Sequence, residues 1–164
     1  MAGRPDRALL VEANLLARAP VAVEAVPGAT ADSGRSSGLW ETMDVVTMTA
    51  EGCLSALARG VPEVQTVVLE HLEDNDGLLL HFLTADLRRY ATEAFDSGRS
   101  DVLQRLLNVI NRALVDGTED VENAMAVSFV EDTGWWDAEM QPFIESWPSK
   151  LRSEALRQKK LRST

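Results

Sequence analysis

The stretch Thr118-Glu-Asp-Val-Glu-Asn-Ala-Met-Ala-Val-Ser-Phe-Val-Glu131 indicates the fold class of this 164-residue chain. Its first half carries three acids, and the segment from Ala124 to Val130 is then apolar on nearly every side. A surface helix has one apolar stripe, whereas a helix that is apolar all round is buried on several faces. The stretch therefore predicts the central helix of a small all-α domain, with Thr118 as its N-cap.

Before this stretch, apolar residues also recur at the three- and four-residue spacing of helices. The pattern predicts helices over 50–59, 62–73, 78–95 and 100–116, with Thr49 and Ser100 as N-caps of the first and the fourth. Turn signals separate these helices, and no strand-like alternation occurs between them. The expected fold is an all-α compact bundle, or a short solenoid of stacked antiparallel hairpins, with about five to seven helices.

The two ends of the chain differ from this body. Residues 1–42 are rich in Pro, Gly and Ser and predict a poorly ordered, dispensable leader with one short helix from Leu9 to Ala19. The helical domain is expected over residues 43–147, with a last helical piece from 139 to 146. Residues 148–164 predict a basic C-terminal helix or tail that either docks on the acidic body or frays.

Charge is unevenly distributed along the chain. Residues 39–147 carry six Arg, no Lys and 21 acids, whereas residues 148–164 carry six basic residues and one acid. An acidic body repels nucleic-acid phosphates and attracts basic proteins, so a basic protein partner is expected and nucleic acid is not. The same charge also fits a role in solubility alone.

The sequence offers no membrane or disulfide signal. It has no apolar run of about 18 residues, and its short N-terminal apolar runs do not form a signal peptide, so a cytoplasmic protein is expected. The single Cys53 excludes disulfide bonds within the chain. Cys53 is interpreted as a small buried side chain, with a reactive thiol as the alternative.

Motifs for metals, cofactors and catalysis are also missing from the sequence. His71 precedes the acids of 73–76, but the spacing fits neither a calcium loop nor a zinc site and indicates a solvated turn. No nucleophile elbow or phosphate loop is present, and Ser128 is expected to be core filler. We therefore expect no enzyme, no cofactor and no metal. A small hydrolase that uses His71 or a partly buried His81 is the weakest alternative.

The candidate partner-binding residues flank the predicted central helix. Trp is enriched at binding hot spots, and acids around it select a basic partner. The alternative to an interface role is that one or both Trp residues close the end of the core. Adjacent Trp residues on a turn rarely both bury, which favours at least one exposed ring. Asn123 is either a core amide, which we expect, or a site residue. The candidate set is Glu119, Asp120, Glu122, Glu131, Asp132, Trp135 and Trp136.

Two segments carry a family resemblance, Leu80-His-Phe-Leu-Thr-Ala-Asp-Leu-Arg-Arg-Tyr90 and Asp120-Val-Glu-Asn-Ala-Met-Ala-Val-Ser-Phe-Val-Glu131. With the Leu-rich helix between them, they resemble a group of small, uncharacterised bacterial helical proteins over roughly residues 49–135. The most specific residues are Asn123, Ser128, Phe129 and Glu131. These proteins are similar in style to immunity proteins of bacterial toxin systems. The resemblance carries no established activity with it. Together with the acidic body, it leads us to expect a non-enzymatic interaction domain of the immunity type that neutralises a basic toxin effector through an acidic surface. A generic helical adaptor or regulatory module of unknown partner is the alternative.

Overall fold

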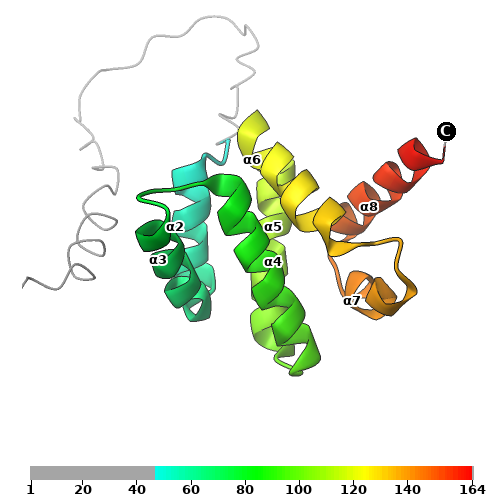
Figure 1. Ribbon diagram of the computed structural model, residues 1–164, viewed down its shortest axis with the longest axis horizontal. Helices are drawn as coiled ribbons and strands as arrows, with labels where there is room; N and C mark the ends of the chain where they lie inside the picture. The colour runs from blue at the N-terminus through cyan, green and yellow to red at the C-terminus, as the bar shows by residue number, and fades with distance from the viewer. Residues whose placement is uncertain (1–46, 164) are drawn as a thin grey trace, which may run out of the picture. The chain divides into compact units, whose positions relative to one another are not determined.

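The structure is a computed structural model that describes residues 47–163. The expected leader 1–42, with its helix from Leu9 to Ala19, lies outside these residues. Seven α-helices follow one another in the described part (Figure 1): α2 (Ala50–Gly60), α3 (Gln65–Asp74), α4 (Leu80–Asp96), α5 (Ser100–Asp116), α6 (Glu119–Ala124), α7 (Gln141–Glu145) and α8 (Ser149–Arg162).

The all-α prediction is confirmed. The described residues contain no strand beyond an isolated bridge between Met48 and Gly117, which ties the segment before α2 to the α5–α6 turn. None of the helices over 47–163 combines the length and the apolar character that crossing a membrane requires. Four short elements complete the fold: η1 (Pro62–Val64), η2 (Met125–Val130), η3 (Glu131–Thr133) and η4 (Ala138–Met140).

Helix α5 packs against many of the other elements. Its neighbours are α2, α4, α6, η2 and α8. Its buried side chains follow the predicted 3.6-residue pattern: Val102, Leu103, Leu106, Leu107, Val109, Ile110 and Ala113. The predicted central helix is buried too, but it shares the centre of the core with α5.

Of the three predicted N-caps, Thr49 and Thr118 stand at the cap positions and Ser100 does not. Thr49 caps α2 as expected, since its Oγ1 accepts a hydrogen bond from the Gly52 N–H at 3.1 Å. Ser100 is instead the first residue of α5, and Arg99 occupies the cap position without a capping side-chain bond. Thr118 does stand at the N-cap position of α6, but its side chain makes no capping bond. The acids in the first turn of α6 remain well placed for the helix dipole.

The predicted helix over 119–131 changes geometry along its length. It begins as α6, continues as the π-helix η2 and ends as the 3₁₀ turn η3. In a π-helix the backbone bond spans five residues, and here the Glu131 N–H reaches the Ala126 carbonyl. The segment lies beside α4 and α8 (Figure 1). Such π turns are rare and often accompany functional sites.

Helix α8 docks on this body. Leu151 and Ala155 are buried, and Asn111 of α5 accepts a hydrogen bond from the Leu151 N–H at 3.3 Å. That bond satisfies one of the free N–H groups in the first turn of α8, which has no side-chain cap of its own. Spacings of four, three and four residues put Gln158 and Arg162 on the same stripe as Leu151 and Ala155. The inward face of α8 is therefore apolar at its start and polar at its end.

Candidate partner-binding site

The π-helix and α8 meet at Gln158. Its side-chain Nε2 donates to the Ala126 carbonyl at 2.9 Å, and its Oε1 accepts from Trp135 Nε1 at 3.0 Å. Because the Ala126 carbonyl belongs to the π-helix, one amide joins α8, η2 and the Trp pair. This network fixes the position of Trp135, which is buried.

The Trp pair divides between core and surface. Trp135 is 7% exposed and Trp136 is 56% exposed, and their rings meet edge to face at 5.2 Å. The chain turns before them at Gly134, whose φ of 73° lies in the left-handed region that favours glycine. As expected for adjacent Trp residues, one packs inward and the other presents its ring to solvent.

Arg162, at the last turn of α8, lies over this pair. Its guanidinium carbon is 4.5 Å from the centre of the Trp136 ring and 5.8 Å from that of Trp135. Its Nη2 also donates to Glu131 Oε1 at 3.0 Å. A cation over an aromatic face and beside a carboxylate is held both by the ring quadrupole and by the opposite charge. We call the Trp136 ring and the Glu131 carboxylate the arginine seat.

The remaining candidate acids lie along the same helical segment. Glu119, Asp120 and Glu122 are exposed on α6, and Asp132 is exposed on η3. Glu122 lies close enough to Arg157 of α8 to raise the pKa of that guanidinium, behind the larger effect of Glu154. We call these four residues together with Glu131 the acidic surface. The structure thus places two of its acids, Glu122 and Glu131, beside arginines of the chain's own α8.

The Glu154–Arg157 pair on α8 carries a pH prediction. Hydrogen bonds from Arg157, at 2.7 and 2.6 Å, hold the pKa of Glu154 below its ordinary 4.5. Since the folded-state pKa is the lower one, the pair stabilises the fold above about pH 4.5 and the gain is lost as the pH falls through the folded pKa. We expect the free energy of unfolding of Glu154→Gln to fall less steeply than that of the wild type as the pH is lowered from about 6 to about 3, as measured by urea unfolding. Parallel curves for both proteins would contradict this.

A second surface cluster was missed at the sequence level. Asn123 is exposed rather than a core amide, and its Nδ2 lies 3.5 Å from His81 Nε2. His81, which was expected to be partly buried, is exposed on α4, and its Nδ1 lies 2.9 Å from Ser128 Oγ. In an α-helix, residues 123 and 128 would point apart, whereas the i→i+5 closure of the π-helix turns both toward His81. Ser128 is buried as predicted.

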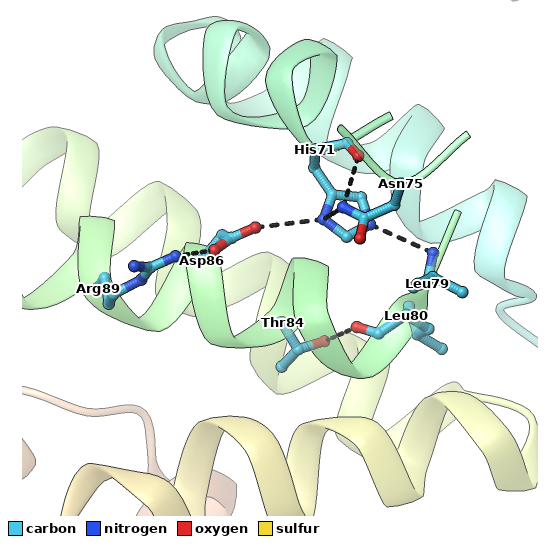
Figure 2. Close-up of polar contacts among 7 residues, drawn as sticks. All are labelled: His71, Asn75, Leu79, Leu80, Thr84, Asp86 and Arg89. Atoms are coloured by element: carbon cyan, nitrogen blue, oxygen red, sulfur yellow. Dashed lines mark hydrogen bonds and ion pairs between the residues drawn. The ribbon is translucent and has the colours of Figure 1, made fainter. Parts of the chain in front are cut away.

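His71 is a structural residue and not part of a solvated turn (Figure 2). It is 3% exposed, its Nε2 accepts from the Leu79 N–H at 3.2 Å, and its Nδ1 faces Asp86 Oδ2 at 3.2 Å. Accepting at Nε2 assigns the proton to Nδ1, which then donates to Asp86. Asn75 also bonds the His71 carbonyl, at 2.8 Å. His71 therefore fastens the α3–α4 turn, and it shares no hydrogen-bonding residue with His81.

The rest of the described surface offers little chemistry. Cys53 is 1% exposed, and burial raises the pKa of its thiol to about 11, so it packs as an apolar side chain. Residues 47–163 hold no group of three His, Cys, Asp or Glu side chains placed to share a metal ion. An open depression on the C-terminal half of α4 is lined by Arg88, Arg89, Thr92, Glu93, Asp96 and Ser97. None of the candidate partner-binding residues lines it.

A family model covers most of this architecture. The model of a domain of unknown function, DUF7674, matches residues 54–162. The match reaches past the expected limit of the resemblance, near residue 135, and takes in α8. Comparisons with curated proteins and with solved structures found no match. Because the family model spans more than half of the sequence, the chain belongs to the DUF7674 family of uncharacterised domains.

Proposed function

We propose that this chain is a cytoplasmic, non-enzymatic interaction domain of the immunity type. It binds a basic effector, such as a toxin nuclease domain, through the acidic surface and the exposed ring of Trp136. The observation that carries the proposal is Arg162, because the site already holds a guanidinium of this chain between an aromatic face and a carboxylate. The seat has the composition of a hot spot for basic proteins.

Electrostatics supports the same assignment. Glu119, Asp120 and Asp132 are exposed at the two ends of one helical segment. Acids in this arrangement attract a basic protein over a distance and repel acidic competitors, so they raise the association rate and the selectivity. A buried ion pair is not required, because exposed charges act mainly on the encounter.

A second function has its own observation. The basic α8 folds back onto the body through Leu151, Ala155 and Gln158. A helical adaptor whose tail neutralises its own acidic face would show this contact, and its partner would bind elsewhere. The two functions differ in one respect: only the first needs the exposed acids for binding.

The test removes three charges from the acidic surface of the full chain. The variant Glu119→Gln/Asp120→Asn/Asp132→Asn is compared with Glu70→Gln/Glu73→Gln/Asp74→Asn. The control acids are exposed on α3, which α4 and α5 separate from α8 in Figure 1. Both variants change the net charge equally. We expect the first to lose at least about tenfold in affinity for the basic protein that the wild type captures from its source cells, and the second to keep it.

The immunity role has a separate readout. The captured protein is expressed in a test host together with the wild type or with either variant. We expect the wild type and the α3 control to restore growth and the acidic-surface variant to fail. Equal losses in the two variants, or a captured protein that is acidic or harmless to the host, would contradict the proposal.

A further inference from the structure

The arginine seat is occupied by a residue from the least anchored part of α8. The residues that fix α8 to the body, Leu151, Ala155 and Gln158, lie at least one turn before Arg162. Arg162 follows in the last turn, where helices fray most readily. The last turn can therefore leave the seat while the rest of α8 stays docked.

The seat is also only half covered. The Trp136 ring is 56% exposed with Arg162 in place, and the Arg162 side chain is itself 54% exposed. An exposed cation–π contact and an exposed ion pair are both weak, so their loss costs little. An incoming side chain of the same chemistry, delivered by a bound partner, can therefore displace Arg162.

We propose that the seat recognises an arginine side chain of the basic partner, and that Arg162 occupies it until the partner's arginine takes its place. This inference rests on the proposed function and names the chemistry that the site reads. A guanidinium over the Trp136 ring can donate an N–H to Glu131 at the same time, as Arg162 does. A lysine ammonium has no planar face to lay on a ring and is more strongly hydrated, so the seat prefers arginine.

Occupation of the seat by Arg162 lowers the apparent affinity for the partner. A site that is mostly filled by its own chain shows a reduced apparent affinity, by the fraction of molecules in which it is open. Basic proteins without a well-placed arginine then gain less from the seat. Arg162 thereby makes binding depend on an arginine of the partner that can replace it, and not on the partner's net charge alone.

The experiment measures peptide binding by the full chain at low ionic strength. The probes are fluorescent nine-residue homopeptides of arginine and of lysine. Arg162→Gln opens the seat, and Arg162→Gln/Trp136→Ala opens it and removes the ring. Arg152→Gln is the matched control, because Arg152 is exposed on the same helix and forms no ion pair among residues 47–163. Thermal unfolding confirms that each variant is folded.

We expect Arg162→Gln to bind the arginine peptide about five- to tenfold more tightly than the wild type. The affinity of Arg162→Gln for the lysine peptide rises much less. In Arg152→Gln the affinity for the arginine peptide rises no more than that for the lysine peptide. Removing the Trp136 ring abolishes the rise seen in Arg162→Gln. Equal gains in Arg162→Gln and Arg152→Gln would overturn the inference while leaving an acidic surface that binds basic chains. If neither peptide binds any variant, the proposed function fails together with it.

Discussion

Replacing Phe129 by Ala is expected to lower the free energy of unfolding by about 3–5 kcal/mol. Phe129 is fully buried in the π-helix, and its ring lies 5.7 Å from that of Trp147. Trp147 in turn meets Phe143 of α7 at 5.5 Å. Deleting the ring leaves a cavity between η2 and the α7–α8 turn, which cannot close without moving these aromatics.

The matched control for Phe129 is Val127→Ala in the same π-helix. Val127 is 37% exposed, so we expect its truncation to cost less than about 1 kcal/mol. Urea unfolding followed by the Trp fluorescence gives both values. A cost below about 1 kcal/mol for Phe129→Ala would mean that this segment is not buried as described.

The second large effect is expected at Gly117, in the turn between α5 and α6. A Cβ added there would lie 2.2 Å from the Ala113 carbonyl oxygen and 2.8 Å from Val121 Cγ1. The backbone oxygen cannot step aside, because it belongs to α5. The same turn bonds Met48, whose N–H reaches the Asp116 carbonyl at 2.6 Å. We expect Gly117→Ala to cost about 3 kcal/mol, at the upper end for overpacking.

Gly52→Ala tests whether this cost is specific to the site. Gly52 lies inside α2, and a Cβ there meets its nearest atoms at ordinary contact distances of 3.5 and 3.6 Å. Removing a helical glycine should therefore stabilise the fold by about 0.5–1 kcal/mol. The melting temperature should be lower than that of the wild type for Gly117→Ala and higher for Gly52→Ala. Shifts of the same sign and size would contradict the described packing at Gly117.

Most of the fold was accessible from the sequence. Apolar residues recur every three to four positions in α4 and α5. The turn residues at Gly60, 74–77 and 96–98 stand at the ends of α2, α3 and α4 or directly after them, as predicted. This spacing places the apolar residues on one face of a helix, so the helix can be predicted without knowledge of its tertiary contacts. The start of α5 was predicted less accurately, because Arg99 and not Ser100 is its N-cap residue and makes no capping bond that the sequence could signal.

The π-helix could not be predicted from the sequence. Its residues, from Met125 to Val130, have ordinary helical propensities, and the wider turn is stabilised by contacts from elsewhere. Gln158, thirty-two residues later than Ala126, bonds the Ala126 carbonyl. Asn123 is predicted to be a core amide because a polar group in a nearly apolar helix needs a partner in the fold. Its actual place beside His81 could not be predicted, since standard helix geometry does not bring Asn123 and Ser128 to one ring.

The candidate site was predicted in part. Composition and position alone named Glu131, Trp135 and Trp136, and the structure brings these three together around one guanidinium. The sequence could not show that the guanidinium belongs to Arg162 of the same chain. That contact depends on how α8 docks, which no local pattern encodes.

The salt dependence of partner binding tests the central claim most directly. The purified basic partner is titrated against the wild type and the Glu119→Gln/Asp120→Asn/Asp132→Asn variant from about 50 to about 500 mM salt. If the acidic surface binds the partner, the wild-type affinity falls steeply with salt and the variant shows a weaker affinity with a shallower slope. A partner that binds both proteins with the same affinity and the same slope would contradict the account.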